Sequence, residues 1–141
     1  MDSKLYNDIG KAVKLAEKYG GTLTEKNLLY VVKVATDIAN KTGADFESLL
    51  SEGVIAMMNV EKKYDSLANK ANKLQGNKFV DISELRNTLE LSESIKKSLN
   101  DVKVNPSSSG ISKLNSELSK LEQTIKNTEQ NAKNIELNVN F

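Results

Sequence analysis

Residues 27–65 have the sequence NLLYVVKVATDIANKTGADFESLLSEGVIAMMNVEKKYD. On both sides of Gly43, apolar residues recur at intervals of three and four, which is the spacing of an amphipathic helix. Gly43 tolerates the left-handed backbone conformation that commonly ends a helix, and Asp45 is a favourable N-cap for the next one. We therefore predict two helices here, the second over residues 46–64, and an all-α fold around them.

Upstream of this pair, the sequence predicts a further helix over residues 3–18. Its apolar face consists of Leu5, Ile9, Ala12, Val13 and Ala16. Gly20 and Gly21 follow and are expected to end it. Thr22 and Glu25 then have the spacing of a capping box, in which the Thr hydroxyl accepts from a free amide of the first turn. We therefore expect Thr22 to cap the next helix.

Downstream of residue 65 the apolar density falls, and Asn, Lys and Ala dominate up to Gly76. This composition predicts a weak helical extension that ends in a turn at Gly76-Asn77. Asp81 and Glu84 match a second capping box. They are expected to open a helix that continues to about Leu99.

The most regular pattern in the chain follows residues 105–110, a Ser-rich segment with the single Pro, which we interpret as a linker. Beyond it, nine positions alternate steps of three and four, which is the 3.5-residue period of a coiled coil. These positions, the heptad seam, are Ile111, Leu114, Leu118, Leu121, Ile125, Thr128, Ala132, Ile135 and Val139. We expect the seam to be buried, either in a homodimer through residues 111–139 or against the rest of the chain. Residues 135–141 also alternate like a strand, which predicts fraying there.

These elements divide the chain into three parts. Residues 1–104 are predicted to form a small helical bundle, and residues 105–110 a linker. Residues 111–141 are predicted to form a long amphipathic helix of the coiled-coil type.

Composition narrows the functional classes. The chain carries 20 basic and 19 acidic residues, so its net charge of +1 gives no general attraction to nucleic acid. It contains no Cys and no His, which removes disulfides, thiol and imidazole chemistry and the common zinc sites. We therefore expect no catalytic residues, no metal site and no cofactor. With no apolar run of about 18 residues and no signal-peptide pattern, a cytoplasmic protein without membrane contact is expected.

The helix predicted over residues 46–64 carries FESLLSEGVIAMM, and KYD follows at residues 63–65. This pattern resembles the second conserved region of bacterial RNA polymerase sigma factors, D-L-[IL]-[QS]-E-G-x-I-G-L-[ML] and K-[FY]-D, preceded by an NLRLV segment. In that family the same helix docks onto the clamp helices of RNA polymerase. The positions that the resemblance implies for polymerase binding are Ser51, Glu52, Val54 and Met58.

Three positions depart from the family pattern. Ser48 replaces an acidic residue, Val54 a small polar residue, and Ala56 the second Gly. Gly53 is kept, although Gly costs about 1 kcal/mol relative to Ala in a helix interior. We therefore expect another backbone to approach closely at Gly53, either for docking or only for tight packing of the two helices.

The resemblance extends loosely over residues 76–104. There it implies that Lys78, Phe79 and Arg86 contact promoter DNA. A surface that holds unpaired DNA needs aromatic side chains to stack on the bases and basic side chains to bind the backbone. Residues 79–101 contain one aromatic residue, and three basic residues stand against five acidic ones. This balance disfavours promoter melting.

Three hypotheses remain open. The first is a sigma-like factor that binds RNA polymerase and contributes to initiation at promoter DNA; its small size would suit a phage-encoded protein that acts in the host cytoplasm. The second is an interaction or structural protein without DNA contact, either a polymerase-binding modulator or a virion protein that assembles through its C-terminal coiled coil. The third is an enzyme, which the lack of a carboxylate or Lys pair in an apolar setting disfavours.

Overall fold

The computed structural model describes residues 3–139, and within this range it contains helices and no strand. The elements are α1 (Ser3–Tyr19), α2 (Glu25–Thr42), α3 (Phe46–Lys73), the 3-10 turn η1 (Leu74–Gly76), α4 (Ile82–Val104) and α5 (Ser108–Val139). The predicted all-α fold is confirmed. Residues 1–2 and 140–141, the outermost residues of the predicted parts, lie outside the described residues. They include the last two residues of the strand-like alternation over residues 135–141.

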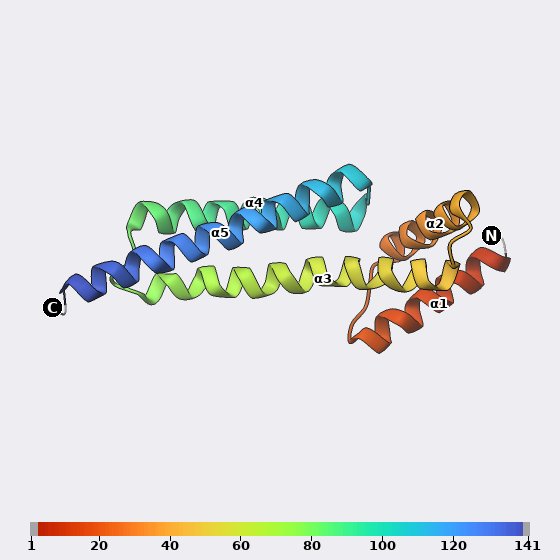
Figure 1. Ribbon diagram of the computed structural model, residues 1–141, viewed down its shortest axis with the longest axis horizontal. Helices are drawn as coiled ribbons and strands as arrows, with labels where there is room; N and C mark the ends of the chain where they lie inside the picture. Colours follow the sequence, from red (N-terminus) through yellow and green to blue (C-terminus); the bar gives the residue numbers. More distant parts are fainter. Residues whose placement is uncertain (1–2, 140–141) are drawn as a thin grey trace.

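The molecule is elongated, and α3 is its central helix (Figure 1). Helices α1 and α2 pack on the N-terminal half of α3, whereas α4 and α5 pack on its C-terminal half. The two chain ends lie at opposite ends of the molecule (Figure 1). The fold therefore consists of two three-helix bundles that share one helix.

Two of the predicted helix starts are confirmed by their capping hydrogen bonds. The carboxylate of Asp45 accepts hydrogen bonds from the N–H of Ser48 at 3.0 Å and from its hydroxyl at 2.8 Å. The carboxylate of Asp81 accepts from the N–H of Glu84 at 3.1 Å. Gly43 ends α2 with φ of 75°, the left-handed conformation expected there.

The predicted cap at Thr22 is wrong, because α2 begins two residues later. Thr24 caps the helix, and its hydroxyl accepts from the N–H of Asn27 at 3.2 Å. Glu25 then lies in the first turn of α2, where a negative charge interacts favourably with the helix dipole.

As predicted, the helix extends beyond residue 64; it continues as α3 to Lys73 and is followed by the 3-10 turn η1, which ends at Gly76. The reason is that Leu67 and Ala71 stay on its buried face, with 3% and 0% exposure. These two positions, four residues apart, help to hold this half of α3 against α4 and α5. The fourth helix is longer than predicted and extends past Leu99 to Val104, because Val102 is buried.

Helix α5 begins at Ser108, inside the segment predicted as a linker. The hydroxyl of Ser107 accepts from the N–H of Gly110 at 3.0 Å and so satisfies a free amide of the first turn. The heptad seam is buried from Leu114 to Ala132 against α3 and α4 of the same chain. Its last two positions, Ile135 and Val139, are exposed.

One continuous apolar core joins the two bundles. It extends from Ala12 of α1 through both halves of α3 to Ile125 of α5. A smaller apolar cluster, formed by Leu74, Val80 and Ala132 with Phe79 and Leu85 packed on it, closes the far end of the second bundle.

Candidate functional site

The four residues expected to bind polymerase lie on two different faces of α3. Glu52 is exposed and Ser51 is half-buried. Val54 and Met58 are 0% and 4% exposed and belong to the core, so a partner that docks on the folded surface does not touch them. The reason is helical phase. Ser51, Val54 and Met58 are spaced three and four residues apart and share the inward face, whereas Glu52 is turned about 100° away from it.

At Gly53, α3 packs tightly against α2. A Cβ atom at Gly53 would lie 2.7 Å from Cγ1 of Val31, which is itself buried on α2. The close neighbour is therefore a side chain, not the backbone that the sequence led us to expect. Of the two alternatives for Gly53, docking or tight packing of the two helices, this contact agrees with tight packing.

An apolar groove of about 310 Å³ follows this crossing on the surface. Tyr30, Val34 and Ile38 line it from α2, and Leu49 and Ala56 line it from α3. Glu52 is the charged residue among those that line it. Val34 and Ile38 are 37% and 38% exposed, so their apolar atoms face solvent. We call this feature the α2–α3 groove.

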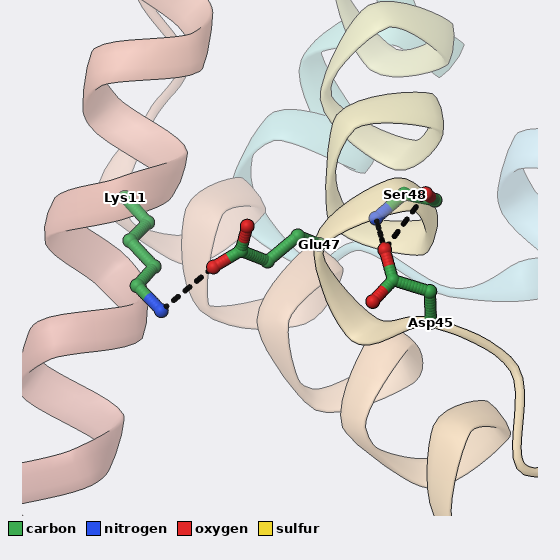
Figure 2. A network of polar contacts seen from close by, with 4 residues as sticks. All are labelled: Lys11, Asp45, Glu47 and Ser48. Carbon is green, nitrogen blue, oxygen red and sulfur yellow. Dashed lines mark hydrogen bonds and ion pairs between the residues drawn. The ribbon is translucent and has the colours of Figure 1, made fainter.

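The start of α3 beside the groove is held in place by polar contacts (Figure 2). Glu47 points across to α1, where Lys11 donates to its Oε1 at 3.2 Å, while Asp45 turns back onto Ser48. The two hydrogen bonds from Ser48 lower the pKa of the Asp45 carboxyl, because they favour its charged form. The Lys11–Glu47 pair is well exposed and so adds little stability. Asp45, Glu47 and Glu52 are exposed acidic residues at this end of α3.

The residues expected to contact DNA lie at the other end of the molecule. Phe79 is half-buried in the small apolar cluster, with the ammonium of Lys78 5.2 Å from its ring centroid. Arg86 is exposed on α4. Helix α3 rises about 1.5 Å per residue, so Glu52 and Lys73 are roughly 30 Å apart along it. The structure therefore does not bring the two predicted sets of residues together.

From the sequence, we did not predict that residues of α2 belong to this site. The signal that could have found it is the run of apolar residues from Leu28 to Val32, followed by Val34. This run covers more of the helix circumference than one buried face requires. Part of it had to remain at the surface: Val34 is exposed and Tyr30 is half-buried.

Two further searches concern chemistry and membranes. Within residues 3–139, no group of acidic side chains is arranged to hold a metal ion. None of the described helices contains an apolar stretch long enough to cross a bilayer. Comparison with protein-family models, curated proteins and solved structures finds no match to this chain.

Proposed function

We propose that this protein is a sigma-like transcription factor that binds RNA polymerase through the α2–α3 groove and modifies promoter-specific initiation. The observation that carries the proposal is the position of Glu52. This carboxylate lies exposed at an apolar groove, on the helix whose sequence resembles the clamp-docking helix of sigma factors.

The groove suits a helical partner. A helix that lies in such a groove places apolar side chains three and four residues apart against its walls. Here Val34, Ile38 and Leu49 offer apolar walls, and Glu52 offers one charge that selects a basic residue of the partner. The clamp helices of RNA polymerase, which the resemblance implies, are a partner of this kind.

Polymerase docking is the larger part of the proposed activity, and promoter contact the smaller. The only aromatic of the predicted DNA-contacting set, Phe79, is partly covered by Val80 and Ala132. Residues 79–101 carry more acidic than basic residues. Strong binding of single-stranded DNA would instead need accessible aromatic side chains and more basic than acidic residues.

The alternative, assembly through the C-terminal coiled coil, is less well supported. It needs a free apolar seam, whereas Leu114, Leu118, Leu121 and Ile125 are at most 2% exposed within one chain. The apolar residues of α5 that remain exposed are Ile135, Leu137 and Val139, at its last turn. Ile135 and Val139 are the last two positions of the heptad seam, and two positions are too few for a coiled coil, which needs several heptads.

The test is binding of the labelled protein to bacterial core RNA polymerase. Glu52→Lys reverses the charge at the groove without touching the core and should weaken binding at least about tenfold, since loss of one partner of a buried charged pair costs roughly 2–5 kcal/mol. Glu129→Lys makes the same change at an exposed position of α5 and should bind like the parent. If the parent protein does not bind, or if Glu52→Lys binds as tightly, the proposed function is wrong. Adding promoter DNA to the same assay separates polymerase docking from DNA contact.

A further inference from the structure

The exposed side of the second half of α3 is polar and basic. In Figure 1, α4 and α5 lie along one side of this half of α3, and no other described helix covers the opposite side. The residues on that open side recur at helical spacing, so they share one face. They are Lys62, Lys63, Ser66, Asn69, Lys70 and Lys73, and all six are exposed. We call them the basic face.

Charge is distributed unevenly around this helix and along the chain. Five of the 20 basic residues, but only one of the 19 acidic ones, fall within residues 62–80, so the remainder of the chain is net acidic. That acidic residue, Asp65, is turned about 100° from Ser66 at the centre of the basic face. Glu61 precedes the face, and its carboxylate is paired with Lys103 at 2.8 Å. The whole-chain charge of +1 therefore includes a local excess of positive charge on α3.

Folding accounts for only part of this arrangement. Lys62 donates to the carbonyl of Tyr19, and its ammonium is 4.3 Å from the centroid of the Tyr19 ring. Lys70 and Lys73 lie in the last turn of α3, where positive charge interacts favourably with the helix dipole. Neither effect concerns Lys63, and neither requires that acidic residues be absent from the face. No ammonium of the basic face forms an ion pair with any carboxylate that the structure describes, so these charges are available to an external anion.

The side chains of the face distinguish between classes of polyanion. The face contains no apolar residue, which a helix bound to a membrane surface needs for insertion between lipids. It contains no aromatic residue either, and single-stranded nucleic acid is held largely by stacking of its bases on aromatic rings. Lysines with hydroxyl and amide side chains between them are instead typical of contacts to the phosphates of a duplex.

We propose that the basic face binds the phosphate backbone of duplex nucleic acid, independently of base sequence. From Lys62 to Lys73 the face is about 17 Å long, at a rise of about 1.5 Å per residue. One strand of a duplex carries about five phosphates over this length, at about 3.4 Å per phosphate. The four ammonium groups therefore face a comparable number of phosphates. This contact is separate from the one predicted for Phe79 and Arg86, and it does not depend on polymerase docking.

The experiment measures the binding of fluorescently labelled short duplexes, of DNA and of RNA, by anisotropy in the absence of polymerase. Two unrelated sequences of each kind should bind equally, with a Kd of about 100 µM or tighter at about 50 mM salt. Four phosphate contacts predict that log K falls with log salt concentration at a slope of about −3 to −4. Amide NMR shifts should place the contact at residues 62–73. Tighter binding of one kind of duplex would identify the source of the phosphates, and either kind supports the proposal.

A paired substitution tests whether binding belongs to the basic face. Lys63→Gln with Lys70→Gln removes two charges, seven residues apart on one side of α3. It should weaken binding at least about tenfold and reduce the steepness of the salt dependence by about 1.8. The matched control is Lys126→Gln with Lys133→Gln, which removes two exposed lysines at the same spacing on α5, where Glu129 lies between them. This control should bind like the parent, and thermal melts should show that both proteins fold.

Three results would overturn the proposal. The first is no saturable binding of either duplex at protein concentrations up to about 1 mM, ten times the expected Kd. The second is an equal loss of binding in the α5 control or in Arg86→Gln, because net charge or the surface of α4 would then be responsible. The third is tighter binding of single-stranded DNA or of anionic phospholipid vesicles than of either duplex, because the face would then serve a different partner.

Discussion

At Gly53, two effects of opposite sign act on one residue. Ala in place of Gly would stabilise an unconstrained helix by about 1 kcal/mol. Here, however, the new Cβ would lie 2.7 Å from a methyl group of Val31, a buried and β-branched side chain that cannot easily move. Overpacking of this kind costs about 1–3 kcal/mol, so the clash should outweigh the helix propensity.

We therefore expect Gly53→Ala to lower the free energy of unfolding by up to about 2 kcal/mol in chemical denaturation. Gly10→Ala is the matched control, because a Cβ there meets no atom within 4 Å. It should stabilise the protein by about 0.5–1 kcal/mol. Adding Val31→Ala to Gly53→Ala should recover part of the loss; if it recovers none, the clash is not the cause.

The N-cap residue Asp45 should make the stability of the protein depend on pH. Hydrogen bonds from Ser48 lower the pKa of its carboxyl in the folded state below the ordinary value of 3.8. A lowered folded-state pKa means that the stabilisation is complete above the unfolded-state pKa and is lost as the pH falls through the folded-state pKa. Asp45→Asn keeps an acceptor at the cap but cannot titrate.

The parent should therefore be more stable than Asp45→Asn at pH 7, and the difference should shrink as the pH falls below the ordinary value of 3.8 and through the lower folded-state pKa. Urea midpoints of both proteins across this range measure it. Asp37→Asn, which changes a carboxylate whose partner is an exposed Lys, controls for the general effect of charge. A difference that stays constant with pH would contradict the capping mechanism.

At the scale of the helix, α5 depends on its apolar seam. Leu118 is 1% exposed between α3 and α4, whereas Lys120, two residues later, is exposed. Leu118→Asp would bury an unpaired charge and remove packing, which should cost roughly 3–5 kcal/mol. Lys120→Asp should change the stability little. Thermal melts of the two variants decide, and similar behaviour of both would mean that the seam does not hold α5.

The helices differ in how far they could be predicted from the sequence. The cap at Asp45, the stop at Gly43 and the seam of α5 are local or strictly periodic signals, and they were predicted. Thr22 and Thr24 are both suitable N-cap residues for the helix that follows, so the local sequence alone could not decide between them. The length of α3 depends on burial of Leu67 and Ala71 by α4 and α5, which are distant in sequence.

The candidate site was predicted less well than the fold, for a related reason. A motif fixes which residues stand on α3 but not which way the helix is turned toward its neighbours. The sequence therefore grouped Glu52 with Val54 and Met58, which the structure places in the core. Likewise, the α2–α3 groove exists only where helices meet. The apolar run from Leu28 to Val34 indicates that α2 has more apolar surface than one face can bury, but not which residues of α3 lie beside it.

At the scale of the whole molecule, one long helix carries two bundles. Helix α3 contributes to both, and one apolar core connects them. Damage in one bundle should therefore be felt in the other, because neither can unfold without freeing half of α3. The hydrogen bond from the Thr24 hydroxyl to the carbonyl of Lys103 adds a polar link between the two bundles, but it is exposed and should contribute less than the core.

This coupling can be tested by cavity-forming substitutions placed in the outer helices of each bundle. Leu28→Ala in α2 and Leu121→Ala in α5 remove buried side chains, 7% and 0% exposed, and each should cost roughly 2–5 kcal/mol. Native-state hydrogen exchange should then show that Leu28→Ala lowers the protection of amides in α5 by nearly its full cost, and that Leu121→Ala does the same in α2. If each substitution lowered protection only in its own bundle, the two bundles would unfold independently. The shared helix would then connect them without making them one cooperative unit.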